Sequence, residues 1–241
     1  MKKLIIIFIL LFPIFVFGVE YHDSNINLTI DVDNHMVFTR NNLKDNPNLE
    51  VLEATEEQMK NIMDQGSIYF DIIPKDLSYE ILVIVPEEKI LVNNLSNVPT
   101  SFINELGDEL AKRVGIDKSE VYKNKYVYVV RDYYDSKSGY NIINYYTVVN
   151  AKGYNFQLQK GERITEEERN TFKKIIDSIN IEILDEYKDE REEVKKAIES
   201  DGKNGLDWQN ILIKGLIGGA VGGLIGLFGF INKKRKLSKV K

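Results

Sequence analysis

The stretch Tyr140–Gln159, YNIINYYTVVNAKGYNFQLQ, decides the fold of this chain. It predicts two strands, Tyr140 to Val149 and Tyr154 to Gln159, joined by a turn at Ala151-Lys152-Gly153. Ile142 to Val149 has apolar residues at both odd and even positions. A strand with one face in solvent has a polar residue at every second position instead. The short link favours antiparallel pairing. We therefore expect this hairpin to lie in a sheet that is covered on both faces.

The segments on either side of the hairpin extend this prediction. Val121 to Tyr134 is a strand candidate that ends at the polar turn Asp135–Gly139. After the hairpin, Thr165 has the character of a helix N-cap, with Glu168 at its capping-box position. The helix that follows carries an apolar stripe at helical spacing, made of Phe172, Ile175, Ile176 and Ile179.

The N-terminal half alternates strand and helix patterns. Ile26 to Val32 and His35 to Arg40 are predicted as strands of one hairpin around Asp33-Asn34, and the residues before them as an unfolded strip. Thr55 caps a predicted short helix with Gln58 as its partner, and Gly66 ends it. The remaining predicted elements are the strands Ile68 to Ile73 and Tyr79 to Val85, the helix Pro99 to Val114 and a last short strand, Ile181 to Ile183.

Together these patterns predict an α+β domain over residues 19–183. Its strands are joined mostly by hairpins, and several are apolar on both faces, so helices are expected to cover the sheet on both sides. The predicted architecture is a three-layer α/β/α sandwich around an antiparallel sheet.

The phrase Tyr145–Phe156, YYTVVNAKGYNF, followed by a Thr165-capped helix that ends in Ile175-Ile176-Asp177-Ser178-Ile179, resembles the PsbP-like sandwich domain. It is also similar to uncharacterised surface proteins of clostridia and bacilli with that fold. The resemblance is best over residues 121–183 and topological over residues 20–115, and Ala151 stands where the family's turn has glycine. It implies the same sandwich fold and a non-catalytic accessory or binding role. It supplies no functional residues.

The C-terminal segment Ile211–Ile231, ILIKGLIGGAVGGLIGLFGFI, has the length and composition of one transmembrane helix. Its 21 residues, at about 1.5 Å each, match a hydrocarbon core of about 30 Å. Trp208 and the snorkelling side chain of Lys214 are expected to anchor the outer interface. The basic tail 232–241 is predicted to be cytoplasmic, with Lys233, Lys234 and Arg235 as its interface anchors.

The N-terminus is a predicted signal peptide, residues 1–18. Lys2 and Lys3 precede a 14-residue apolar run, Leu4 to Phe17, and cleavage is expected after Gly18. An uncleaved anchor is the alternative, and both arrangements place residues 19–208 outside the cytoplasm. Residues 184–210 are predicted as a charged stalk helix and linker. No LPxTG-type sorting motif precedes the span and the chain has no cysteine, so we expect a retained single-pass protein of the cell membrane.

Glycines of the predicted span recur at a spacing that favours helix association. Four overlapping GxxxG pairs are formed by Gly215, Gly218, Gly219, Gly222, Gly223 and Gly226. Small residues at this spacing let two helix backbones approach closely in lipid. The pattern predicts a homo-oligomer or a partner transmembrane helix, and it offers a structural or assembly role as an alternative function.

The charge distribution limits which classes of partner the domain is expected to bind. All 37 acidic residues lie between residues 19 and 208, while nine of the 32 basic residues lie at the two ends of the chain. The part between the ends is therefore strongly acidic, which argues against a nucleic-acid partner because phosphate backbones need cationic surfaces. The remaining expectation is an unknown extracellular ligand or protein.

No catalytic or cofactor motif is present. There is no HExxH, GxSxG or phosphate-binding loop, and the lack of cysteine removes thiol chemistry. Asp31, Asp33 and His35 form an ordinary turn pattern rather than a calcium loop, so we predict no metal, no cofactor and no catalytic residues. A carboxylate-dependent envelope enzyme remains as an alternative.

Tyrosines are concentrated in the strand-rich region. Nine of the 13 lie between Tyr122 and Tyr154. Tyrosine suits a half-buried strand, but it also provides stacking area with a polar tip for glycans or peptides. The aromatic-surface hypothesis names four residues whose exposure tests it: Tyr133, Tyr134, Tyr140 and Tyr146.

Overall fold

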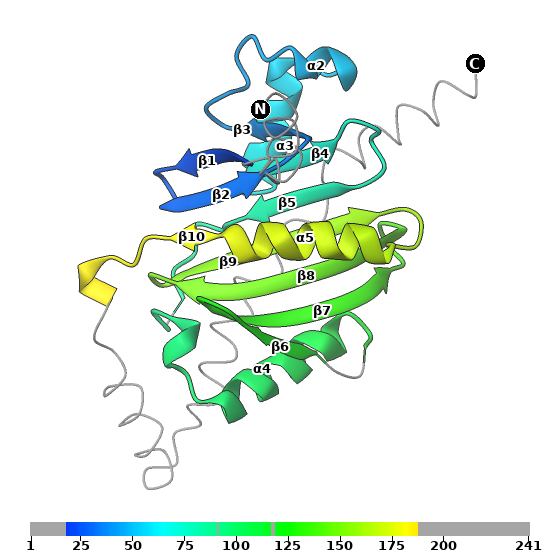
Figure 1. Ribbon diagram of the computed structural model, residues 1–241. Coiled ribbons are helices and arrows are strands. Elements are labelled where there is room, and N and C mark those ends of the chain that lie inside the picture. The colour runs from blue at the N-terminus through cyan, green and yellow to red at the C-terminus, as the bar shows by residue number, and fades with distance from the viewer. Residues whose placement is uncertain (1–17, 91, 117–118, 188–241) are drawn as a thin grey trace, which may run out of the picture.

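The computed structural model describes residues 18–90, 92–116 and 119–187, and its main element is a seven-stranded antiparallel sheet (Figure 1). The hairpin of β8 (Tyr140–Val149) and β9 (Lys152–Lys160) lies near its centre. The strand order is β3 (His35–Thr39), β4 (Ile68–Pro74), β5 (Glu80–Ile84), β9, β8, β7 (Val127–Asp135) and β6 (Glu120–Lys123).

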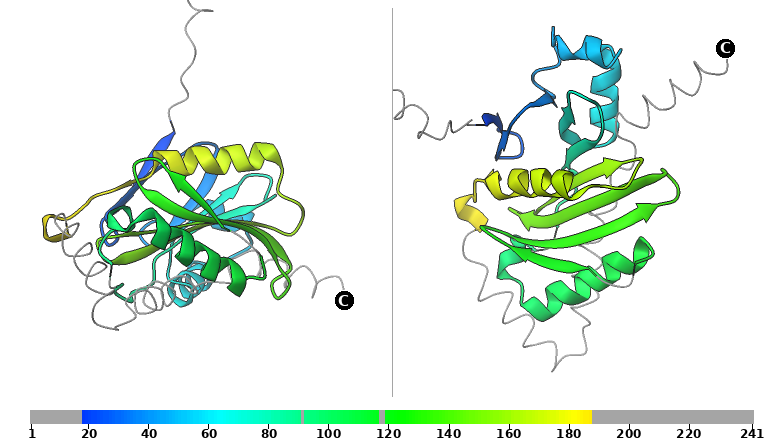
Figure 2. Two further views of the ribbon diagram at one scale, coloured as in Figure 1. Left: turned by 90° about the horizontal axis from the view of Figure 1, so that it is seen from below. Right: turned by 45° about the vertical axis from the view of Figure 1, so that its right-hand side comes forward.

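Helices cover both faces of this sheet, as the sequence predicts. α5 (Glu166–Ser178) lies across one face, and its Phe172 and Ile176 share an apolar cluster with Ile143 of β8. On the opposite face, α4 (Thr100–Arg113) packs over β6 and β7, and α3 (Glu56–Gln65) packs over β4. Figure 2 shows the sheet between these two layers. Short α2 (Asn48–Val51) and the 3₁₀ turn η1 (Leu95–Asn97) complete the second layer.

A second, three-stranded sheet lies beside α5, and the sequence analysis missed it. β2 (Leu28–Val32) pairs with β1 (Val19–Asp23) and with β10 (Asn180–Ile181). The predicted hairpin between residues 26–32 and 35–40 is therefore wrong, because β2 and β3 belong to different sheets. The predicted unfolded strip is also wrong, since it forms β1. Alternate residues of β2 are buried in the cluster that contains α5, so packing on the helix outweighs pairing with the adjacent strand.

The local signals at helix ends are confirmed. Thr55 and Gln58 form a capping box on α3, and Thr165 and Glu168 form one on α5. In each, the threonine hydroxyl accepts a bond from the backbone N–H three residues on, and the side chain at that position accepts one in return. Such a cap stabilises a helix by about 1 kcal/mol. The predicted helix over 99–114 is confirmed as α4.

Two turns differ from the prediction. The predicted strand over 121–134 is interrupted, because the Asn124 side chain accepts a hydrogen bond from the backbone N–H of Tyr126 (2.9 Å) and turns β6 back along β7. The turn of the central hairpin consists of Asn150 and Ala151, with φ values of 54° and 56°, and β9 already begins at Lys152. Two successive positive φ angles define a type I′ turn, whose twist matches that of the strands.

The predicted terminal segments lie mostly outside the described residues. These are the signal peptide up to residue 17, the stalk beyond residue 187, the span 211–231 and the basic tail. The start of the predicted stalk forms a 3₁₀ turn, η2 (Asp185–Tyr187), and the Asn94 amide donates a hydrogen bond to the Tyr187 carbonyl (2.7 Å). Within the described part of the chain, no helix is long and apolar enough to span a membrane.

Candidate functional site

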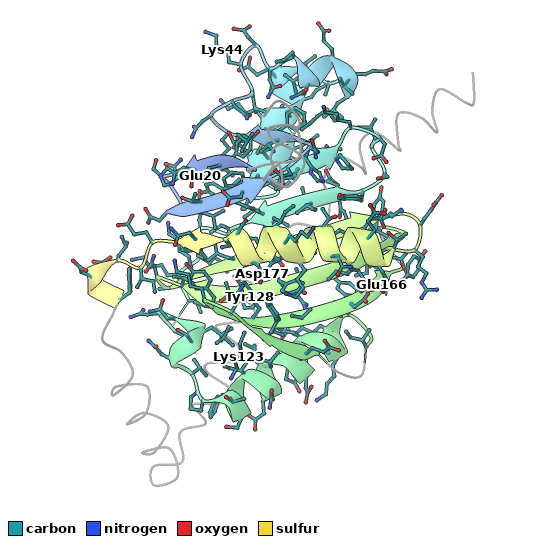
Figure 3. The ribbon with its side chains drawn as sticks, viewed as in Figure 1. Glu20, Lys44, Lys123, Tyr128, Glu166 and Asp177 are labelled. Carbon is teal, nitrogen blue, oxygen red and sulfur yellow. The ribbon has the colours of Figure 1, made fainter. Side chains whose placement is uncertain are left out.

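An open cleft of about 380 Å³ lies between α5 and the outer strands of the sheet. Its walls combine acidic, basic, amide and apolar side chains. Figure 3 shows α5 running over the strands, with Tyr128 and Asp177 labelled beside it. The lining residues are Glu120 of β6, Val130 and Asp132 of β7, Ile143 and Tyr145 of β8, and Arg169, Asn170, Phe172 and Lys173 of α5.

Strand and helix periodicity bring these residues together. Val130 and Asp132 are two positions apart on β7, so both side chains point to the face that α5 covers. Ile143 and Tyr145 do the same on β8. On α5, Arg169 and Lys173 are four residues apart, so they lie about one helical turn from each other on the same side of the helix. The cleft thus has an apolar floor on the strands and a cationic rim on the helix.

One ion pair connects the rim to the floor. The Arg169 guanidinium lies 2.6 Å from the Asp132 carboxylate and 3.5 Å from the carboxylate of Glu166, one turn earlier on α5. The Arg169 and Asp132 side chains are 32% and 51% exposed, so both remain accessible from the solvent. Their charges are paired with each other and are also available to a ligand.

A second network surrounds Lys173. Its ammonium group donates to the Tyr122 hydroxyl and to the Asp177 carboxylate, both at 2.7 Å. The Tyr122 hydroxyl and the Asn124 amide also donate to Asp177. The hydrogen bond to Asp177, together with that to Tyr122, raises the pKa of Lys173. Burial alone would raise the pKa of Asp177, but the bonds from Lys173, Tyr122 and Asn124 lower it. The lysine is therefore charged and the carboxylate ionised at neutral pH.

An aromatic cluster forms the base beneath these charges. The Tyr145 ring makes edge contacts with Phe172 at 5.5 Å, with Tyr122 at 5.7 Å and with Tyr128 at 5.9 Å between ring centres. Edge-to-face pairs of this kind are worth about 0.5–1.5 kcal/mol beyond their buried area. Within this cluster, Tyr122 and Tyr145 remain partly exposed.

The four tyrosines named by the aromatic-surface hypothesis do not form one surface. Tyr140 and Tyr146 are buried, which contradicts their assignment. Tyr146 faces the α4 layer, because it alternates with Tyr145 along β8. Tyr133 is half-buried, and its pKa is raised by burial. Only Tyr134, which is 58% exposed, has the predicted accessibility.

The exposed aromatic edge therefore lies elsewhere than predicted. Tyr134 shares its strand face with Asp132, Tyr145 of β8 lines the cleft, and Tyr122 of β6 accepts a hydrogen bond from the cleft residue Lys173. The sequence did contain a signal for the strand side of the cleft, because alternation along β7 assigns Val130, Asp132 and Tyr134 to one face. The charges on α5 left no comparable signal, because a charged helix flank is most often simply solvated.

The remaining predicted site residues lie either outside the described residues or away from the cleft. The glycines of the predicted span, its anchors Trp208 and Lys214 and the basic residues from Lys233 onward lie outside the described residues. His35 interacts with the Asp33 carbonyl and, at 2.8 Å, with the Tyr79 hydroxyl. Among the described residues, no group of three or more His, Cys, Asp or Glu side chains is placed to hold a metal ion.

No family model and no curated protein matches the chain. Among solved structures, it is similar to the solution structure of cyanobacterial PsbP (CyanoP) from Synechocystis sp. PCC 6803. That similarity has a TM-score of 0.43 and 12% identity, over 71% of this chain and 96% of that one. A crystal structure from Bacteroides thetaiotaomicron at 1.50 Å resolution has a TM-score of 0.39 and 7% identity, over 68% of this chain and 48% of that one. Similarities of this degree assign no ligand and no activity.

Proposed function

We propose that this chain is an accessory module that binds another molecule in the cleft beside α5 and catalyses no reaction. The observation that carries the proposal is the cleft itself, an open volume of about 380 Å³ with aromatic and apolar walls, the partly exposed Arg169 and the exposed Lys173 on its rim. Ligand sites commonly combine an apolar lining with a few fixed polar groups.

The ligand that fits this chemistry is a peptide segment of another protein. Arg169 and Lys173 offer donors to carboxylate and carbonyl oxygens, while Glu120 and Asp132 offer acceptors to N–H groups. Tyr145 and Phe172 supply apolar contact to side chains between those polar groups. A peptide carries donors, acceptors and apolar groups in alternation, so it uses every part of the cleft.

We further propose that the module acts outside the cytoplasm at the cell membrane. The supporting observations are in the sequence: the apolar run after Lys2-Lys3, the span Ile211–Ile231 and the basic residues that follow it. A protease-accessibility measurement on intact cells tests this topology. Digestion of residues 19–208 with protection of a C-terminal tag is the expected result, and protection of both regions would overturn it.

Site-specific photo-crosslinking in living cells tests the cleft. A photoreactive phenylalanine analogue placed at Glu120 or Tyr134 is expected to capture a partner protein, because Glu120 lines the cleft and the exposed Tyr134 lies on the same strand face as Asp132. The matched control is the same analogue at Lys44, an exposed position far from α5 (Figure 3). Equal crosslinking from all three positions, or turnover of an envelope substrate by the purified protein, would contradict the proposal.

A second candidate function, assembly through the span, rests on the glycine register. Gly219 and Gly222 each belong to two of the four GxxxG pairs. Gly219→Leu or Gly222→Leu is expected to abolish a crosslinked dimer of the full chain in detergent, while Leu227→Ile keeps it. A chain that is monomeric before any substitution would exclude this function.

A further inference from the structure

The outermost strand of the main sheet, β6, is shorter than its neighbour β7, so part of β7 has an open edge. β6 pairs with β7 only over Val127–Val130, whereas β8 pairs with β7 as far as Asp135. Among the described residues, no strand pairs with the β6 side of β7 beyond Val130. Residues 131–135 therefore form an open sheet edge with a length of about 17 Å.

The chain before β6 turns away from this edge. The backbone N–H of Ile116 donates a hydrogen bond to the Ala111 carbonyl at the end of α4 (3.1 Å). Ser119 lies so close to Gly107 of the same helix that a Cβ at the glycine would collide with the serine hydroxyl. Ile116 and Ser119 are thus held at the α4 layer, away from the line that β6 would follow if it continued along β7.

Two carbonyl groups show which residues of β7 direct their backbone toward β8. The Val127 carbonyl accepts a hydrogen bond from the Thr147 hydroxyl of β8 (2.7 Å), and the Asp135 carbonyl accepts one from the N–H of Gly139 in the turn that leads to β8 (2.8 Å). Successive residues of an antiparallel strand direct their backbone groups to opposite sides. The odd-numbered residues of β7 therefore face β8, and the even-numbered residues beyond the last pair with β6 face the open edge.

Asp132 and Tyr134 are the two residues whose backbone groups point to this edge. Their side chains are exposed as well, on the face of β7 that α5 covers. Each residue thus offers one backbone donor, one backbone acceptor and an exposed side chain. Exposed peptide groups in such a row are a template for pairing with another extended chain. The edge is continuous with the cleft, because Asp132 belongs to both.

The charges beside the edge favour a basic partner strand over a second copy of this chain. Glu120 and Asp132 place two carboxylates on the α5 side. Within the described part of the chain, Asp132 pairs with Arg169, and Glu120 takes part in no ion pair. A second copy would bring the same acidic side chains to the edge, and like charges in opposite positions destabilise strand pairing. A basic residue across from Asp132 compensates the excess negative charge instead, and an apolar residue across from Tyr134 contacts its ring.

We propose that the open edge of β7 binds an extended segment of a partner protein as an added antiparallel strand, in line with β6. The segment carries an apolar residue opposite Tyr134 and, two positions later, a lysine or arginine opposite Asp132. Its backbone bonds to these two residues of β7, and its side chains on the α5 side reach the cleft. Antiparallel pairing is the slightly more stable arrangement, and β6 already uses it. The inference rests on the proposed peptide-binding function and specifies how the peptide is held.

Peptide binding to two matched variants tests the edge. Linear peptides are selected from a phage-displayed library on the full chain in detergent, and the affinities of the synthetic peptides are measured by fluorescence polarisation. Tyr134→Pro removes the backbone N–H at the edge, where proline is tolerated. Tyr134→Ala removes the same ring but keeps the N–H. Tyr134→Pro is expected to bind the selected peptides about tenfold more weakly than Tyr134→Ala, because a backbone hydrogen bond is lost.

N-methylation of the selected peptides provides a second measurement, which uses the wild-type protein and does not depend on the folding of a variant. In the proposed register, the N–H groups of the apolar and the basic residue point to β7, and the N–H of the residue between them points away. N-methylation of either of the first two is expected to weaken binding about tenfold or more. N-methylation of the residue between them should leave the affinity unchanged.

Three results would contradict the added strand, and they differ in what they say about the cleft. Peptides that bind Tyr134→Pro and Tyr134→Ala equally, tolerate N-methylation at every position and lose binding to Arg169→Ala would overturn the added strand and leave the cleft as a peptide site. A selection that yields no binding peptide would overturn both proposals. A dimer of the full chain that dissociates in Tyr134→Pro but not in Tyr134→Ala would assign the edge to a second copy instead.

Discussion

The Arg169 guanidinium of α5 lies 2.6 Å from the Asp132 carboxylate of β7, and this ion pair joins the helix to the strand within the cleft. The pair is half-open to solvent. Exposed ion pairs contribute about 0–1 kcal/mol to folding, so its energetic value for the fold is small. Its position suggests a role in recognition, since a peptide carboxylate can replace Asp132 on the guanidinium without unfolding the domain.

Arg169→Ala is therefore expected to separate binding from stability. The free energy of unfolding should change by less than about 1 kcal/mol, while the yield of the crosslinked partner from position Glu120 should fall severalfold. The yield is measured in living cells, and the free energy by urea denaturation. Lys44→Ala is the control, and a variant whose stability and crosslinking fall together would show a structural role instead.

Ala151→Gly is expected to stabilise the protein. Ala151 has φ 56° in the type I′ turn of the central hairpin, where a Cβ is disfavoured and glycine is not. The expected gain is about 0.5–1 kcal/mol, partly offset by the greater freedom of glycine in the unfolded chain. Chemical denaturation measures it. A loss of stability would show that the buried methyl group of Ala151 contributes more than the relief of strain.

Gly153→Ala is expected to have the opposite effect, two residues away. A Cβ at this position would lie 2.9 Å from Ile90 Cδ1 and 3.0 Å from the Tyr146 hydroxyl oxygen. Tyr146 is fully buried and has little room to move, so overpacking should cost about 1–3 kcal/mol. The same denaturation experiment measures this cost. Restoration of stability by adding Tyr146→Phe would identify the hydroxyl as the source of the clash.

Asp71→Asn is expected to change the pH dependence of stability. The pKa of Asp71 is higher in the folded than in the unfolded chain, so its stabilising effect is complete below the unfolded pKa of about 3.9. That effect is lost as the pH rises through the folded pKa. The wild type should thus lose stability with rising pH over this interval, and Asp71→Asn should lose less.

The stability of Asp71→Asn relative to the wild type should therefore increase with pH, because the buried carboxyl of the wild type loses its proton and the neutral amide of the variant does not titrate. Urea denaturation between pH 5 and about pH 9 checks both statements. Glu57→Gln, on the exposed side of α3, should leave the pH profile unchanged. Parallel profiles for the wild type and Asp71→Asn would contradict the raised pKa.

Local features were predicted well because they depend on neighbours in the sequence. The threonine caps of α3 and α5 need only a glutamine or glutamate three residues later. The doubly apolar hairpin strands required cover on both faces, and the structure supplies it with α5 on one side and α3 and α4 on the other. The second sheet was missed because β10, its third strand, joins β2 from more than 140 residues away.

The candidate site was not predictable from the same signals. Tyr145 and Tyr146 are adjacent and chemically identical, yet one lines the cleft and the other is buried under the α4 layer. Alternation along a strand separates the two residues but does not say which face is open. The charged residues of α5 can be assigned to a cleft only when the positions of β6, β7 and β8 beneath the helix are known.

The amino-acid sequence by itself determined most strands and the longer helices of this protein, the helix caps and the need for a sheet covered on both sides, because each follows from hydrophobic period and local hydrogen bonding. Only the tertiary structure decided that β2 leaves the main sheet and that the cleft opens beside α5. It also placed Asp71 and Glu80 together in the interior. These outcomes depend on the energies of contacts between segments far apart in the sequence, which local sequence patterns do not reveal.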